Sequence, residues 1–132
     1  MSLATPIPTS EGERLKRRAQ TLISERRKVF VRRGRRALLL RLLAVGNASA
    51  DDVRAVVELP PGLSPKLFGA VPIALIQAGA IRADGFRRTA RREGHARPVQ
   101  VWILADRDAA IAWLENNPDS HLGDGSQPSL FD

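Results

Sequence analysis

The sequence predicts an α+β domain that is mainly α with a small β-hairpin. Apolar residues recur at helical spacing as far as residue 78, which indicates a series of amphipathic helices. The period then changes to two, and the alternation of Val99, Val101 and Ile103 with their neighbours indicates a strand. Helices followed by a hairpin with an arginine-rich tip are typical of the winged helix-turn-helix fold, which is the architecture that we expect.

The composition restricts the class of protein further. The chain has 132 residues, of which 43% are hydrophobic, enough for one domain with its own core. Cysteine is absent, which excludes disulfides, Cys-ligated zinc and thiol catalysis. No apolar run approaches the roughly 18 residues that a membrane span needs, and the first residues lack the pattern of a secretory signal. We therefore expect a soluble cytoplasmic protein without a membrane partner.

The N-terminal region divides into two expected segments. Residues 1–9 are rich in proline and are expected to be disordered. Ser10 and Glu13 have the spacing of a capping box, which predicts the start of a basic helix over residues 10–36. The arginines of residues 32–36 surround a glycine, so this stretch either interrupts the helix or joins it to the next one.

Residues 37–117 are expected to form the winged-helix domain. Its first helix ends at Val45, and Ser49 is the predicted N-cap of the second helix, with Asp51 and Asp52 in the first turn. Residues 53–59 form the predicted positioning helix and residues 65–78 the recognition helix. Ser64 is its N-cap, and Pro72 is expected to kink or divide it. The residues predicted to face the core include Leu38, Leu39, Leu42, Leu43, Val53, Val56, Val57 and Ile76.

The charge of the chain is concentrated in two blocks. The net charge is +7, and residues 13–36 hold 11 basic and 2 acidic side chains, while residues 82–97 hold 6 and 2. Of the 21 cations, 18 are arginine, whose planar guanidinium fits phosphate and guanine edges. A GC-rich genome would also explain the excess of arginine, but it explains the clustering less well. The clustering indicates binding to a polyanion.

The predicted nucleic-acid-binding residues come from the basic segment, the recognition helix and the hairpin tip. The recognition helix offers few polar side chains, so we expect modest sequence specificity and an affinity that comes mainly from phosphate contacts of the hairpin arginines. The predicted set is Arg32, Arg33, Arg35, Arg36, Ser64, Lys66, Gln77, Arg87, Arg88, Arg91, Arg92, His95 and Arg97.

A set of short motifs is spread over roughly residues 50–104. They are Ser64-Pro65, Phe68-Gly69-Ala70-Val71, Ala78-Gly79-Ala80-Ile81, Gly85-Phe86-Arg87-Arg88-Thr89, Arg91, His95-Ala96-Arg97 and Val101-Trp102. This pattern resembles that of small phage and prophage proteins regarded as winged-helix DNA-associated factors. The resemblance implies the fold, but no established activity.

The sequence offers no pattern typical of catalysis. His95 and His121 are the only histidines, and neither has a carboxylate cluster at metal-ligand spacing. There is no phosphate-binding glycine loop and no nucleophile elbow. We therefore expect neither an enzyme nor a cofactor or metal. Trp102 and Trp113 could stack on bases, but their spacing favours a place in the core.

Residues 118–132 are expected to be a flexible tail that ends in a binding peptide. Gln127, Ser129, Leu130 and Phe131 resemble the bacterial sliding-clamp-binding pentapeptide, in which Leu and Phe enter a hydrophobic pocket and Gln anchors by hydrogen bonds. The resemblance implies recruitment to a replication clamp. The alternative is that Leu130 and Phe131 fold back onto the domain.

These observations together predict a phage or bacterial protein that binds double-stranded DNA, an accessory of replication or regulation associated with the nucleoid. Two alternatives stay open. One is a basic protein that binds RNA or the ribosome, with the arginine-rich helix as its main contact. The other is a protein-interaction adaptor that uses the same helix. The oligomeric state also stays open.

Overall fold

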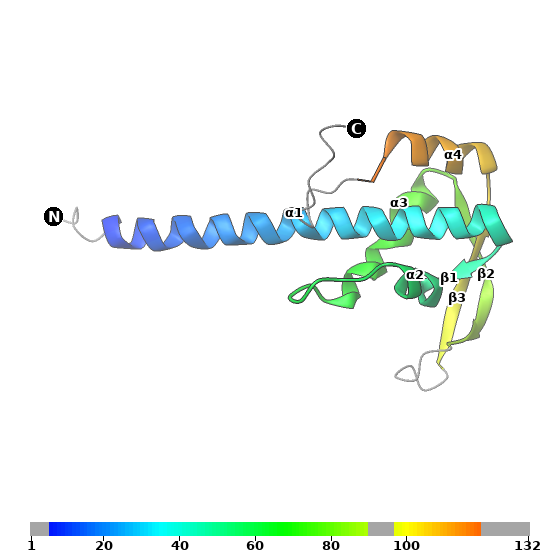
Figure 1. Ribbon diagram of the computed structural model, residues 1–132, viewed down its shortest axis with the longest axis horizontal. Coiled ribbons are helices and arrows are strands. Elements are labelled where there is room, and N and C mark those ends of the chain that lie inside the picture. The colour runs from blue at the N-terminus through cyan, green and yellow to red at the C-terminus, as the bar shows by residue number, and fades with distance from the viewer. Residues whose placement is uncertain (1–5, 90–96, 120–132) are drawn as a thin grey trace.

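The computed structural model describes residues 6–89 and 97–119, with side chains from residue 11 onward. It is mainly helical with a small three-stranded antiparallel sheet, which confirms the α+β class. One long helix dominates the molecule, and its N-terminal half projects beyond the rest of the domain (Figure 1). The elements in chain order are α1 (Pro6–Val45), β1 (Ala48–Ser49), α2 (Ala50–Val56), the 3-10 helix η1 (Pro65–Ala70), α3 (Val71–Gln77), β2 (Ile81–Arg88), β3 (Pro98–Leu104) and α4 (Arg107–Asn116).

Helix α1 is continuous over 40 residues, so the arginines of residues 32–36 join the two expected helices rather than interrupt them. The helix begins at Pro6, which differs from the expectation that residues 1–9 are disordered. Proline is tolerated in a first turn, where the missing N–H would have no helical partner. Ser10 consequently lies inside α1 and is not its N-cap, which corrects the predicted capping box.

Gly34 marks a close crossing and not a break in α1. It is buried, and a Cβ at this position would lie 2.7 Å from Cγ2 of Val71 and 3.3 Å from Cδ1 of Phe68. Glycine in a helix interior costs about 1 kcal/mol relative to alanine. The absence of a side chain at residue 34 therefore lets α1 approach η1 and α3 closely.

The predicted caps of the shorter helices are confirmed. Ser49 Oγ accepts a hydrogen bond from the Asp51 N–H at 3.2 Å, and Asp52 Oδ2 accepts one from the Ser49 N–H at 2.8 Å, which completes a capping box for α2. Ser64 Oγ accepts from the Lys66 N–H at 3.2 Å at the start of η1. Pro65 follows in the first turn of η1, a position that suits its fixed φ.

The predicted recognition helix is divided in two, as Pro72 predicted. Pro72 lies in the first turn of α3, directly after η1 has ended at Ala70. An uninterrupted helix would place the proline ring against the carbonyl four residues earlier and would lose one hydrogen bond. The division leaves α3 with only seven residues.

The sheet has β3 in the centre, with β1 and β2 antiparallel to it on either side. Ile81 lies opposite Leu104, and Ala48 lies opposite Trp102. The β2–β3 hairpin was predicted, whereas β1 was not, because two residues are too few to show a period. Gly85 has φ +81 where the register of β2 shifts between Ala83 and Phe86, so the strand bulges there.

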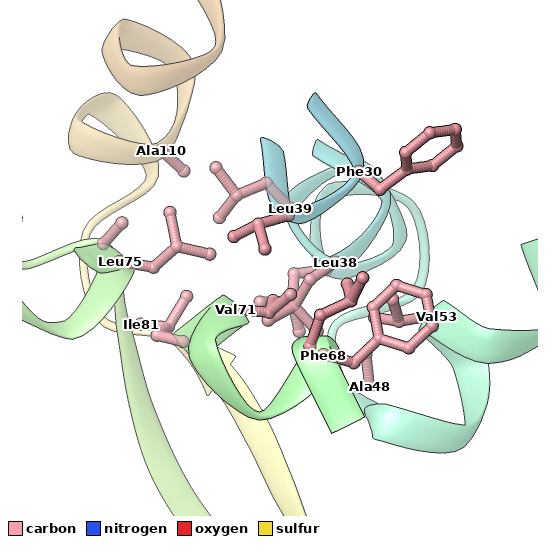
Figure 2. Packing of buried hydrophobic residues seen from close by; sticks show 14 of the residues in the cluster. Phe30, Leu38, Leu39, Ala48, Val53, Phe68, Val71, Leu75, Ile81 and Ala110 are labelled. Carbon is pink, nitrogen blue, oxygen red and sulfur yellow. The ribbon is translucent and has the colours of Figure 1, made fainter. Parts of the chain in front are cut away.

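The core lies between α1, the shorter helices and the inner end of the sheet, where α4 closes it through Ala110 (Figure 2). The most deeply buried large side chains are Leu38, Leu39, Leu42 and Leu75. The prediction is thus confirmed for Leu38, Leu39 and Leu42 of α1 and for Val53, whereas Leu43 is half-buried and lies outside this cluster. Trp102 and Trp113 pack against this core, which confirms that interpretation of both residues.

Two predicted core residues are exposed. Val56 is 71% exposed at the end of α2, and Ile76 is 46% exposed on α3. In α3 the core side is formed by Val71 and Leu75, which are four residues apart, and Ile76 is turned about 100° away from Leu75.

Of the helices within residues 6–89 and 97–119, none combines the length and the hydropathy that crossing a bilayer requires.

Candidate nucleic-acid interface

The side chain of Arg33, a residue of α1, is held in place by contacts within the chain. Its guanidinium carbon lies 4.9 Å from the centroid of the Phe30 ring, and its Nε donates to Asp119 Oδ1 at 3.0 Å. The Arg33 side chain is only 16% exposed. These contacts fasten the segment after α4 to α1 and use the guanidinium of Arg33, which the sequence predicted for nucleic acid.

Arg35 and Arg36 hold the ends of other helices. Arg35 donates to the backbone oxygens of Ala70 at 2.8 Å and Val71 at 3.1 Å. Arg36 donates from Nη1 to the oxygens of Leu114 and Asn117, both at 2.9 Å. The last carbonyls of a helix lack helical partners and carry partial negative charge. A cation at the end of α4 therefore donates hydrogen bonds to these oxygens and also offsets their charge. Burial lowers the pKa of the Arg35 guanidinium from its ordinary value, which is high enough that the group stays charged.

The basic segment therefore contributes to the fold as well as to the charge. Sequence reasoning assigned Arg33, Arg35 and Arg36 to nucleic acid because their charge is visible in the sequence and their partners are not. Arg32 is half-buried, and its Nε has no hydrogen-bond partner in the described part of the chain. Nucleic-acid contact by these four arginines stays a prediction.

Arg87 ties the hairpin to the start of α2. Its Nη2 donates to Asp52 Oδ2 at 2.6 Å and to Ser49 Oγ at 3.0 Å. Thr89, one residue beyond β2, donates from Oγ1 to Asp51 Oδ2 at 2.6 Å. Asp51 and Asp52 thus have a second role besides their place in the first turn of α2, because they fix the outer end of β2.

We expect Arg87→Ala to lower the free energy of unfolding by about 1 kcal/mol, because it removes charge-assisted hydrogen bonds to a partly buried carboxylate. Arg88→Ala is the matched control, since Arg88 is exposed and has no ion pair among the described residues. Urea denaturation of both variants measures the difference. Equal losses in the two would mean that the Arg87–Asp52 pair contributes nothing to stability.

The predicted recognition residues offer a small polar surface. Ser64 is used as a cap, while Lys66 and Gln77 are exposed. Ile73 and Ile76 are the exposed large apolar residues of α3, and neither can hydrogen-bond to a base edge. Arg97 is exposed at the start of the returning strand. The predictions for Arg91, Arg92 and His95, and for Gln127, Ser129, Leu130 and Phe131, fall outside the described residues and stay predictions.

The first half of α1 provides cations that the predicted set did not include. We call residues 11–28 the projecting arm, because this part of α1 extends beyond the rest of the domain (Figure 1) and nearly every side chain in it is exposed. Arg14 and Lys28 form exposed ion pairs with Glu11 and Glu25 at 2.8 and 3.4 Å. Four further cations have no ion pair within the part of the arm that the structure describes; these are Lys16, Arg17, Arg18 and Arg27. The signal in the sequence that could have identified these exposed cations is the small number of apolar residues before Val29. With so few apolar residues, this part of the helix does not pack into the core.

Two hollows lie beside the core. The larger, of about 760 Å³, lies between α1 and the segment after α2, and its lining includes Phe30, Leu40 and Pro60. The smaller, of about 240 Å³, is lined by Val53, Phe68 and Trp102 among others. Within residues 6–89 and 97–119, no group of three or more His, Asp or Glu residues is arranged to hold a metal ion.

Comparisons with protein-family models, curated proteins and solved structures found no match to this chain.

Proposed function

We propose that this chain binds double-stranded DNA, mainly through contacts to phosphates, and that it has no catalytic role. The observation that carries the proposal is the set of exposed cations without ion pairs on the projecting arm. Successive residues of a helix are about 100° apart, so Lys16 and Arg27 lie within about 20° of each other. Arg17 lies about 100° further round from Lys16, on the side away from Leu22. A cationic surface of this kind is suited to the regularly spaced phosphates of a duplex.

The order of the elements supports a winged-helix interpretation. In that fold a helix, a short strand, two helices and a hairpin follow one another, as α1, β1, α2, η1–α3 and β2–β3 do here. On this interpretation η1–α3 takes the place of the recognition helix and the β2–β3 hairpin that of the wing. Arg88 and Arg97 at the outer end of the hairpin would then add phosphate contacts to those of the arm.

The surface of α3 argues for weak sequence preference. Its exposed residues include Ile73, Ile76 and Gln77, and only Gln77 can form hydrogen bonds with a base edge. Phosphate contacts position a protein on DNA but do not read its sequence. We therefore expect similar affinities for duplexes of different sequence.

The test compares a duplex DNA, a single-stranded DNA and a structured RNA of equal length by fluorescence anisotropy at matched salt. If the protein neutralises about six phosphates, duplex affinity should fall roughly a thousandfold between 50 and 200 mM salt. The variant Lys16→Ala, Arg17→Ala and Arg27→Ala should reduce the slope of log affinity against log salt by about 2.7, or about 0.9 for each phosphate that is no longer neutralised.

Arg107→Ala is the control for this variant. It removes a cation from α4, which lies beside the C-terminal half of α1 and away from the arm (Figure 1), and it should leave the slope unchanged. An unchanged slope in the triple variant would contradict the role of the arm. Tighter binding to structured RNA than to duplex DNA would favour the RNA-binding alternative instead.

A further inference from the structure

The projecting arm has an apolar side that nothing in the described chain covers. Leu15, Ala19, Leu22 and Ile23 follow one another at spacings of four, three and one, which places them on one side of α1. Leu15, Leu22 and Ile23 are 60, 59 and 56% exposed. Most of the stability of helices in proteins comes from packing of an apolar side rather than from helix propensity. A partner that covered this stripe would therefore stabilise the arm.

A row of charges borders the stripe and indicates which partner fits. Glu11, Arg18, Glu25 and Arg32 are seven residues apart, and the sign of the charge alternates at each step. Seven residues make almost two full turns, so these four positions lie along one line beside the apolar stripe. The side chains of Glu11 and Glu25 are 61 and 65% exposed.

We propose that the arm pairs with the arm of a second copy of this chain, in antiparallel orientation. Around a two-fold axis, Arg18 then lies opposite Glu25 of the second copy, and Glu11 lies opposite Arg32, each pair occurring twice. The same register places Ala19 opposite Leu22 of the second copy, a small residue against a large one. In a parallel pair, Arg18 and Glu25 would instead face Ile23 and Phe30 of the second copy, and their charges would have no partner there.

The ion pairs inside the arm do not compete strongly with this arrangement. Glu11–Arg14 and Glu25–Lys28 are exposed pairs three residues apart, a class that contributes little to stability and is screened by salt. Both carboxylates can therefore exchange partners when a second copy approaches.

A lipid surface fits the stripe less well than a second copy does. The stripe contains no aromatic residue, and Glu11 and Glu25 on its border would face anionic headgroups. In the antiparallel pair Arg17 and Arg27 point away from the second copy, whereas Lys16, seven residues before Ile23, lies at the edge of the stripe and Arg18 belongs to the charge pairs. Arg17 and Arg27 thus stay accessible to nucleic acid in the dimer, and the inference does not depend on the proposed function.

Sedimentation equilibrium of the full chain, without nucleic acid and from about 1 to 200 μM, tests the proposal. Few aliphatic side chains are buried, so we expect a monomer–dimer equilibrium with a dissociation constant on the order of micromolar. Leu15→Glu with Leu22→Glu should give a monomer at all these concentrations. The melting temperature of that monomer should match that of the wild-type monomer at low concentration, because both residues lie outside the core.

A charge exchange tests the orientation. Arg18→Glu alone and Glu25→Arg alone should each weaken the dimer about tenfold, because each replaces attraction by repulsion at two symmetric positions. The double variant Arg18→Glu with Glu25→Arg should restore wild-type association, since the pairs are formed again with the signs reversed. Arg107→Glu on α4 makes the same change in net charge as Arg18→Glu and should leave the dimer unchanged.

Three results would overturn the proposal. The first is a wild-type chain that stays monomeric at about 200 μM. The second is a dimer that persists with Leu15→Glu and Leu22→Glu, and the third is a double charge variant that stays as weak as the single ones. Binding of anionic vesicles that is lost in the Leu15→Glu, Leu22→Glu variant, without self-association, would assign the stripe to a membrane surface instead. None of these measurements involves nucleic acid, so their failure is distinguishable from failure of the DNA-binding proposal.

Discussion

Replacing Leu75 by alanine is expected to lower the free energy of unfolding by about 2 to 5 kcal/mol, whereas the same change at Ile76 is expected to cost less than about 1 kcal/mol. Leu75 of α3 is fully buried and lies near Leu39 of α1 and Ala110 of α4 (Figure 2), so its truncation leaves a cavity. Ile76 follows it directly in the same helix but is 46% exposed. Urea denaturation followed by circular dichroism measures both losses.

The two variants control for each other. Both replace a four-carbon aliphatic side chain by alanine in α3, so any effect on helix propensity is similar. A difference of several kcal/mol between them therefore reports burial alone. Equal losses would mean that Ile76 packs against the core in solution and that α3 is rotated relative to the structure described above.

Alanine at residue 34 is expected to destabilise the protein by about 1 to 3 kcal/mol, although alanine is the better helix former. The added methyl group would lie 2.7 Å from Cγ2 of Val71 and 3.3 Å from Cδ1 of Phe68. Both neighbours are at most 5% exposed, so neither can move aside without disturbing the core. The clash therefore outweighs the gain of about 1 kcal/mol in helix propensity.

Gly12→Ala is the matched control, because Gly12 lies in the same helix and a methyl group added there would meet nothing within 4 Å. We expect it to stabilise the arm slightly, which helical content by circular dichroism would show, and not to lower the free energy of unfolding. If Gly34→Ala also raised stability, α1 would have to stand further from η1 and α3 than the structure places it.

The parts of this fold that the sequence predicted correctly are those with local signals. Ser49 and Ser64 were recognisable as caps because the residues that they cap follow within three positions. Pro72 predicted the division of the recognition helix because proline acts on its own turn. The strand β1 had no such signal, since two residues gain their strand geometry only from pairing with β3.

The candidate site was predicted less well than the fold, because the partners of its arginines are distant in sequence. Nothing in the sequence distinguishes Arg36 from Arg17, yet Arg36 donates to the carbonyl of Leu114, 78 residues further along, and Arg17 is exposed. Charge clustering predicts where cations are concentrated. Which of them remain available to a ligand is decided by tertiary packing.

Because α1 is continuous, the distance that the projecting arm extends from the core is fixed. The arm and the core share one helix without a break, and the 18 residues of the arm, from Glu11 to Lys28, correspond to about 27 Å at 1.5 Å per residue. A DNA duplex rises 3.4 Å per base pair, so this length equals about eight base pairs. If the chain binds a duplex as proposed, this rigid helix would set the distance between the phosphates that the arm contacts and those that the hairpin contacts.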